Sequence, residues 1–106
     1  MSDTASNYVQ SIVDGSDVVL FINGIPAQPQ CSLSADMVSI LHRLNAPFKP
    51  VNMLSSPRIR EALKDSGPQL FVKGEFVGHS GIVKEMYASG ALTNLLSDKG
   101  IAIRPV

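Results

Sequence analysis

The spacing of hydrophobic positions changes several times along the 106 residues, and these changes predict where strands and helices lie. Short continuous apolar runs between polar or turn residues are typical of buried strands, whereas apolar residues three or four apart are typical of one helical face. On this basis strands are expected at 18–22, 48–52, 69–72 and 75–77. The pair Lys73-Gly74 predicts a two-residue hairpin turn between the last two strands, with the glycine supplying a positive φ.

Helical spacing predicts five helices between and around these strands. The first carries Tyr8, Val9, Ile12 and Val13 and closes near Gly15. The second follows position 31, has Ser32 and Ser34 as candidate N-caps, and ends before Pro47. The third begins at Ser56-Pro57, with serine as N-cap and proline at the first helical position. The last two follow residues 78–81 and Gly90.

The expected order is therefore α-β-α-β-α-β-β-α-α. A strand–helix–strand unit followed by a helix and a hairpin implies a mixed sheet with helices on both faces. We expect an α/β fold class of thioredoxin-fold architecture, with a four-stranded mixed sheet flanked by helices.

Composition limits the classes of protein that fit. A chain of 106 residues suits one domain, 1–106, with its core at about 9–96. Lys+Arg and Asp+Glu are 9 each, so no bulk attraction to nucleic acid is indicated, and no apolar run is long enough to span a membrane. No targeting segment is visible, although a domain trimmed of a transit peptide would look the same. We therefore expect no nucleic-acid and no membrane partner.

Cys31 is the only cysteine, and it lies where the first strand gives way to the second helix. Unpaired N–H groups and the helix dipole favour an anion there, so the thiol is expected to have a lowered pKa and to act as nucleophile and metal ligand. Pro26, Pro29 and their polar neighbours mark the preceding segment as an exposed loop. The alternative is a buried, inert cysteine that packs as a small hydrophobe. A single cysteine excludes an internal disulfide and fits a reducing intracellular compartment, the cytoplasm or the mitochondrial matrix.

Several motifs resemble the monothiol glutaredoxins, whose strand-and-loop signature reads F-M-K-G-T-P-x-x-P-Q-C-G-F-S. Residues 21–34 of this chain read F-I-N-G-I-P-A-Q-P-Q-C-S-L-S. Downstream, 47–52 read P-F-K-P-V-N, 59–64 read I-R-E-A-L-K, and 68–78 read P-Q-L-F-V-K-G-E-F-V-G. Residues 82–92, I-V-K-E-M-Y-A-S-G-A-L, are similar to the family's C-terminal helix. The resemblance covers residues 9–96 and has all of its motifs in the family's order.

The resemblance implies glutathione, or a related low-molecular-weight thiol, as co-ligand, and binding or transfer of a 2Fe-2S cluster. Such a cluster needs four thiolates and this chain supplies one, so a homodimer bridged by the cluster and two small thiols is the expected stoichiometry. Cys31 would be both the catalytic thiol and the cluster ligand. Iron–sulfur scaffold and acceptor proteins would be the partners.

The resemblance also implies a groove for the co-thiol. Its expected residues are Arg60, which reaches a carboxylate in the family, and Gly67, whose backbone N–H and C=O face the co-thiol just before the proline Pro68. The helix-start amides of Ser80 and Gly81 complete the groove. The Gly67–Pro68 bond is expected to be cis, as at the family's proline. The other interpretation of Arg60 is a solvated charge on a helix face, and His79 and His42 are interpreted as exposed residues rather than ligands.

Four departures from the family pattern accompany these matches. The family's lysine is Asn23, its active-site Gly-Phe is Ser32-Leu33, and the acidic residue that faces the glutathione amino group is Gly81. Several residues, including the family's Trp-Pro, are missing between Lys64 and Pro68. Two further functions therefore remain open: a glutathione-dependent thiol–disulfide oxidoreductase, and a degenerate thioredoxin-fold interaction module without a cluster.

Overall fold

The computed structural model describes residues 4–63, 67–101 and 103. Its helices are α1 Thr4–Asp14, α2 Ser32–Arg43, α3 Pro57–Leu63, α4 Ser80–Ser89 and α5 Ala91–Asp98. The strands of the main sheet are β1 Val18–Ile22, β4 Lys49–Asn52, β5 Gln69–Val72 and β6 Glu75–His79. Three short elements were not predicted: β2 Gly24–Ile25, β3 Gln28–Pro29 and the 3-10 helix η1 Met53–Ser55.

The main sheet has the strand order β4-β1-β5-β6. Strand β1 runs parallel to β4 and antiparallel to β5, and β5 and β6 form the predicted hairpin. Both residues of its turn, Lys73 and Gly74, have positive φ, as a two-residue hairpin turn requires. The predicted four-stranded mixed sheet of a thioredoxin fold is confirmed.

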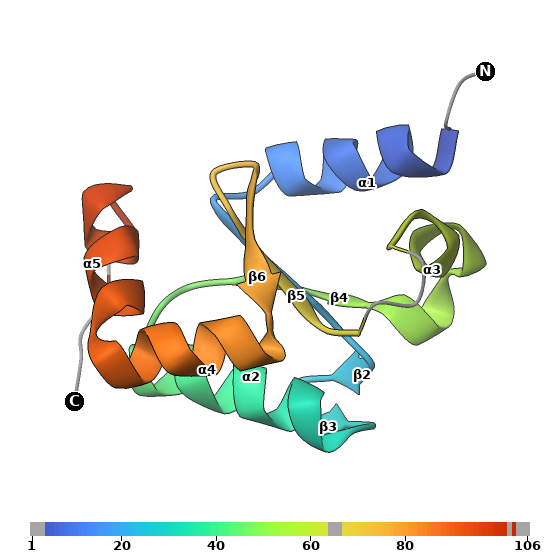
Figure 1. Ribbon diagram of the computed structural model, residues 1–106. Helices are drawn as coiled ribbons and strands as arrows, with labels where there is room; N and C mark the ends of the chain where they lie inside the picture. Colours follow the sequence, from blue (N-terminus) through green and yellow to red (C-terminus); the bar gives the residue numbers. More distant parts are fainter. Residues whose placement is uncertain (1–3, 64–66, 102, 104–106) are drawn as a thin grey trace.

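Helices cover both faces of this sheet, as predicted (Figure 1). Val18, Leu20 and Ile22 of β1 point into a core cluster with α2, α4 and α5. Val19 and Phe21 of the same strand point into the opposite cluster, under α1 and α3. Every residue of β1 is buried, because successive side chains point to opposite faces of the sheet and helices cover both faces.

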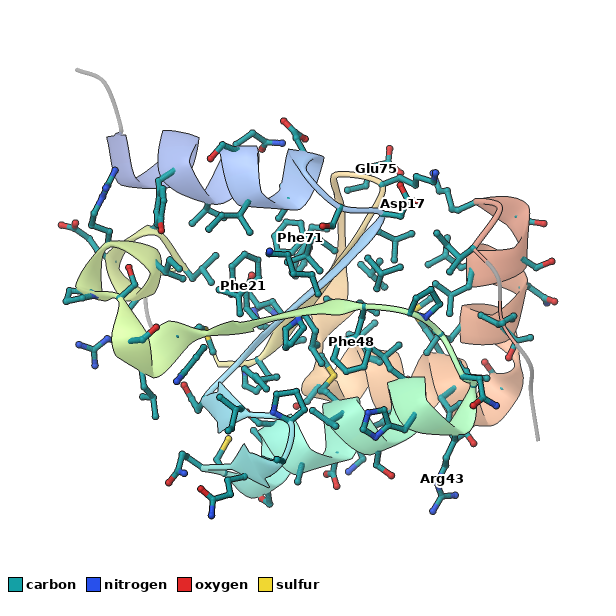
Figure 2. All side chains as sticks on the ribbon, turned by 180° about the vertical axis from the view of Figure 1, so that it is seen from behind. Asp17, Phe21, Arg43, Phe48, Phe71 and Glu75 are labelled. Carbon is teal, nitrogen blue, oxygen red and sulfur yellow. The ribbon has the colours of Figure 1, made fainter. Side chains whose placement is uncertain are left out.

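The cluster under α1 contains an aromatic pair. The rings of Phe21 and Phe71 meet edge to face with centroids 5.5 Å apart, between the sheet and α1 (Figure 2). Phe48, on the other face, packs against the larger cluster instead of joining β4, so that strand begins one residue later than predicted.

Helix ends agree with the sequence except at one cap. The Oγ of Ser56 accepts a hydrogen bond from the N–H of Ile59 at 3.3 Å, which confirms the predicted start of α3. Gly90 takes a φ of 85° and separates α4 from α5. The N-cap of α2, however, is Cys31 itself, so the prediction of Ser32 or Ser34 was wrong. None of the helices among the described residues has the length and apolar character needed to cross a bilayer.

The prediction of a cis bond between Gly67 and Pro68 was also wrong. No peptide bond among the described residues is cis. Gly67 has a φ of 86°, which is open to glycine and strained for other residues. The chain enters β5 through this glycine and Pro68. The family's missing residues are placed between Lys64 and Pro68, and residues 64–66 of this segment lie outside the described residues.

Candidate functional site

One end of the sheet gathers the segments that carry the candidate residues. Strands β1 and β4 end together, because Ile22 pairs with Asn52. Strand β5 begins and β6 ends at the same place, because Gln69 pairs with both Phe21 and His79. The loop to Cys31, the turn into α3, the entry to β5 and the start of α4 therefore meet at this end (Figure 1).

The loop that leads to Cys31 is a small hairpin rather than an irregular segment. Strands β2 and β3 pair antiparallel, and the N–H of Gln30 donates to the carbonyl of Asn23 at 2.8 Å. Gly24 has a φ of 98°, and a Cβ there would lie 2.7 Å from the carbonyl oxygen of Gln28. Only glycine fits so tight a turn. The hairpin fixes the chain immediately before the thiol.

Asn52 ties this hairpin to the next wall of the site. Its Oδ1 accepts hydrogen bonds from the N–H groups of Gly24 and Leu54, both at 2.9 Å. One side chain thus joins the loop after β1 to the turn after β4, and the bonds hold the two segments at a fixed separation.

Cys31 caps α2 with its own sulfur. Its backbone is extended, with φ −149° and ψ 157°, and the Sγ accepts a hydrogen bond from the N–H of Ser34 at 3.4 Å. The Ser34 hydroxyl lies 3.1 Å from the Sγ, and the Nδ2 of Asn23 donates to it at 3.6 Å. The thiol is partly exposed. Cys31 is therefore not fully buried, whereas the alternative interpretation expects a buried thiol.

Ser34 is fully buried, and its hydrogen bonds are arranged for a thiolate. Its Oγ accepts the N–H of Asn23 at 2.9 Å, which occupies an acceptor position and leaves the hydroxyl proton free to point at the Sγ. A hydroxyl has one proton and two lone pairs, so it serves both contacts at once. Ser34 thus connects the backbone of Asn23 with the Cys31 sulfur in a small hydrogen-bond network.

These contacts decide the ionisation of the thiol. Partial burial raises the pKa of Cys31, but the hydrogen bonds from the Ser34 side chain, the Ser34 backbone and the Asn23 amide outweigh it. The pKa therefore lies below its ordinary value, as the position at the start of α2 predicts. A larger share of thiolate makes Cys31 a better nucleophile and a better ligand for soft metals.

A pocket of about 200 Å³ lies next to the thiol. Asn23 lines this pocket and also donates a hydrogen bond to the Cys31 Sγ. The lining residues are Asn23, Met53, Leu54, Arg60 and Gly67. Arg60, on α3, is the one charged residue among the described residues that line this wall. We call this space the Cys31 pocket.

The structure brings some of the predicted groove residues together and separates others. Arg60 and Gly67 line the Cys31 pocket, whereas Pro68, Ser80 and Gly81 lie at the same end of the sheet but outside its wall. Ser80 is buried, and a Cβ at Gly81 would meet nothing within 4 Å. His79 precedes α4 and makes no side-chain cap hydrogen bond. The start of α4 is thus open at Gly81.

Sequence reasoning missed several residues of the site. Asn23 was treated only as a lost lysine, yet its amide contacts the sulfur. Ser34 stands three residues after Cys31, the spacing at which a cap receives its hydrogen bond, and this spacing was a usable signal. Met53 and Leu54 carried no comparable pattern. Among the described residues, His, Cys, Asp and Glu do not form a group of three or more that could hold a metal, so a centre at Cys31 would need ligands from elsewhere.

Comparison with known proteins places this geometry in a family. The family model described as Glutaredoxin matches residues 18–77. The probable monothiol glutaredoxin 2 of Rickettsia typhi is 36% identical over 104 residues, which are 93% of this chain and 94% of that protein. The chain belongs to the monothiol glutaredoxin family.

Further relatives of this glutaredoxin include longer proteins. Monothiol glutaredoxin-S11 of Oryza sativa subsp. japonica is 41% identical over 101 residues, or 91% of this chain, and the chain spans only 21% of that protein's length. The solution structure of a monomeric truncated mutant of Trypanosoma brucei 1-C-Grx1 matches with a TM-score of 0.84 and 36% identity, over 95% of this chain and 96% of that chain. Monothiol glutaredoxin-S15 of Arabidopsis thaliana, named as mitochondrial, is 32% identical over 92% of this chain and 60% of its own length. Glutaredoxins are a glutathione-linked family.

Proposed function

We propose that this monothiol glutaredoxin binds a 2Fe-2S cluster as a thiol-ligated homodimer and passes the cluster to acceptor proteins. The observation that carries the proposal is the partly exposed Cys31, with its lowered pKa, beside a pocket that contains one cationic residue. A thiolate is the ligand type that iron–sulfur clusters require. The cluster is cargo in this proposal, and Cys31 is the residue that holds it.

The number of ligands supports a dimer. A 2Fe-2S cluster takes four thiolates, and the chain has a single cysteine. Two chains and two small thiols complete the set, so the small thiol must lie within reach of Cys31. The Cys31 pocket offers that place, because it shares Asn23 with the surroundings of the sulfur.

The chain's own residues divide the work in this site. The Nδ2 of Asn23 and the N–H of Ser34 donate to the Cys31 sulfur, and the Ser34 hydroxyl, 3.1 Å away, can donate to it when Cys31 is a thiolate. These groups stabilise the negative charge without adding a positive one. Arg60 offers a guanidinium to one carboxylate of glutathione or a related thiol. The backbone of Gly67 is available to the peptide-like part of that molecule. Recognition thus depends on one charge and on backbone groups.

The pocket is small for its ligand. Its volume of about 200 Å³ is below the roughly 300–1,000 Å³ typical of sites that enclose a small molecule. The glycyl arm of glutathione fits such a space better than the whole tripeptide. We therefore expect free glutathione to bind weakly to the apo monomer, whereas metal–thiolate bonds hold it in the dimer.

A glutathione-dependent oxidoreductase is the second candidate, and the lowered pKa of Cys31 favours it. The Cys31 thiolate would attack the glutathione sulfur of a glutathionylated protein, form a mixed disulfide and release the protein thiolate. A second glutathione thiolate would then attack the mixed disulfide, giving glutathione disulfide and free Cys31. This cycle needs firm recognition of glutathione, so it ranks below the cluster carrier. The degenerate interaction module is the third candidate, and the shortened segment before Gly67 is its main support.

Anaerobic reconstitution tests the proposed function. The wild-type chain is incubated with iron, sulfide and glutathione and its absorption spectrum is compared with that of Cys31→Ser. The proposal predicts a visible cluster spectrum and acid-labile sulfide in the wild type alone. Equal colour in both proteins would refute the role of Cys31, and a colourless wild type would favour the interaction module. Turnover of a glutathionylated substrate separates the oxidoreductase, and transfer to an apo-ferredoxin tests the passing-on of the cluster.

A further inference from the structure

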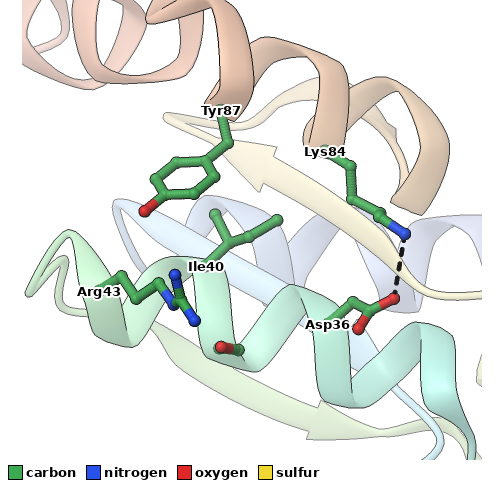
Figure 3. A pocket seen from close by; sticks show the side chains of 6 residues that line it. Asp36, Ile40, Arg43, Lys84 and Tyr87 are labelled. Atoms are coloured by element: carbon green, nitrogen blue, oxygen red, sulfur yellow. Dashed lines mark hydrogen bonds and ion pairs between the residues drawn. The ribbon is translucent and has the colours of Figure 1, made fainter.

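A second pocket, of about 210 Å³, lies between α2 and α4, away from the walls of the Cys31 pocket (Figure 3). Its lining residues are Asp36, Ser39, Ile40, Arg43, Lys84 and Tyr87. Four of these residues belong to α2. Ser39, Ile40 and Arg43 follow Asp36 by three, four and seven positions, so all four share one helical face. We call this space the α2–α4 groove.

The two ends of the groove differ in charge pairing. At one end the Nζ of Lys84 contacts the Oδ2 of Asp36 at 3.2 Å. At the other end Figure 3 shows the guanidinium of Arg43 and the hydroxyl of Tyr87. Among residues 4–63, 67–101 and 103, no carboxylate forms an ion pair with Arg43. Two cations and one carboxylate leave the groove with a net positive charge at the Arg43 end.

The middle of the groove is apolar. Ile40 forms its floor and is only 7% exposed, while the half-buried ring of Tyr87 forms a wall. A volume of about 210 Å³ is smaller than the roughly 300–1,000 Å³ of typical small-molecule sites. It suits one apolar side chain that enters between the helices, with a carboxylate beside it near Arg43.

We propose that the α2–α4 groove is a docking site for an acidic segment of a partner protein, in which an apolar side chain enters over Ile40 and a neighbouring carboxylate pairs with Arg43. The groove begins at Asp36, five residues after Cys31, or about 8 Å along the helix axis. A partner bound here would therefore stand beside the thiol without covering it. This inference does not depend on cluster binding.

Peptide titration followed by NMR tests this docking site. The probe is a five-residue peptide with a central leucine and glutamate at the other four positions, added to the apo protein at low salt. We expect chemical-shift changes centred on Ser39, Ile40, Arg43 and Tyr87. Replacing the leucine by serine should weaken binding about tenfold or more, because the apolar contact is lost. Replacing the glutamates by lysine should abolish the shifts.

Protein variants separate the groove from bulk charge. Arg43→Glu should weaken binding of the acidic peptide about fivefold or more, and Arg43→Gln should do so to a smaller extent without reversing the charge at the end of α2. Arg58→Glu is the charge control: Arg58 is exposed on α3, on the opposite face of the sheet, and its reversal changes the net charge equally. The guanidinium of Arg58 lies 4.3 Å from the centroid of the Tyr8 ring, so urea unfolding first checks that this variant is folded. Binding by Arg58→Glu should equal that of the wild type.

Several results would overturn the docking site. Absence of shifts at millimolar peptide, equal shifts with the lysine peptide, or equal losses in the Arg43 and Arg58 variants would each do so. Shifts of the same residues by isovalerate alone would indicate a small-acid site instead. Concentration-dependent shifts of the groove without any peptide would indicate contact between two copies of this chain.

Discussion

The two sides of the space around Cys31 are built differently. On the α2 side, three neutral donors from Asn23 and Ser34 converge on the sulfur, and a buried hydroxyl links them. On the opposite side, the described part of the wall of the Cys31 pocket includes the charged residue Arg60 and the glycine backbone of residue 67. The first side lowers the pKa of the thiol, and in the proposed function the second side would recognise the small thiol. On that proposal the hydrogen bonds to the sulfur are present, while Asn23 and Gly81 replace two charged residues that the family uses for glutathione.

The largest expected effect comes from restoring two contacts that the family makes to glutathione, one at Asn23 beside the sulfur and one at Gly81 at the start of α4. The double variant Asn23→Lys, Gly81→Asp returns one positive and one negative contact that the family uses for glutathione. A charged hydrogen bond contributes about 1.5–3 kcal/mol in a shielded site and less where water reaches it. If bound glutathione shields both positions, the two together should tighten its binding roughly a hundredfold or more, and by less if Gly81 stays exposed as it is in the free chain. Calorimetric titration of apo monomers measures this change. Micromolar binding by the unmodified chain, unimproved in the variant, would remove the contrast between the two sides.

The next largest effect is expected from removing a hydrogen bond on the side of the Cys31 sulfur. Ser34→Ala removes the hydroxyl that faces the Sγ and leaves the N–H of Asn23 without its acceptor. The pKa of Cys31 should rise, because fewer hydrogen bonds oppose its partial burial. The free energy of unfolding should fall by about 1–3 kcal/mol, the cost of an unsatisfied buried donor. Alkylation rate against pH measures the first change and urea unfolding the second.

Ser39→Ala is the matched control for that substitution, because Ser39 is exposed on the same helix. It should leave both the alkylation midpoint and the unfolding free energy near their wild-type values. A Ser34→Ala protein that behaves like Ser39→Ala would show that the buried network does not tune the thiol.

The smallest effect is a pH dependence of stability. The pKa of Cys31 is lower in the folded chain than in an unfolded one, where it is roughly 8.5. The folded state therefore binds fewer protons, so stability should rise as the pH increases from the folded pKa to the unfolded pKa, and level off above it. Conversely, this contribution is lost as the pH falls through the folded pKa. Urea unfolding across pH 6–9.5, roughly the window around a free thiol's pKa, measures the slope, which Cys31→Ser should lack.

The sequence predicts the helices and strands that position this site better than it predicts the contacts between the residues that line it. Strand β1, the start of α3 at Ser56-Pro57 and the helix break at Gly90 carry strong local signals, and all three are confirmed. These features depend on apolar runs, caps and glycine conformations that neighbours along the chain decide. The four-stranded fold was predicted because the main strands and α-helices follow one another in the expected order.

The walls depend on contacts between distant segments. The hydrogen bond from the N–H of Gly24 to Asn52 joins residues 28 positions apart, and no local pattern marks it. The Gly67–Pro68 prediction failed for a related reason: the family's proline was carried over, but the shortened connection turns at Gly67 instead. The charge arrangement of the α2–α4 groove likewise appears only when two helices lie side by side.

The central claim is that Cys31 shares a cluster with a second chain and with small thiols. Native mass spectrometry of the anaerobically reconstituted protein tests it most directly, because it weighs every component of the assembly at once. The account predicts two chains, one 2Fe-2S cluster and two glutathione molecules, with no such species for Cys31→Ser. A cluster on a single chain, or a dimer that holds the cluster without any small thiol, would contradict it.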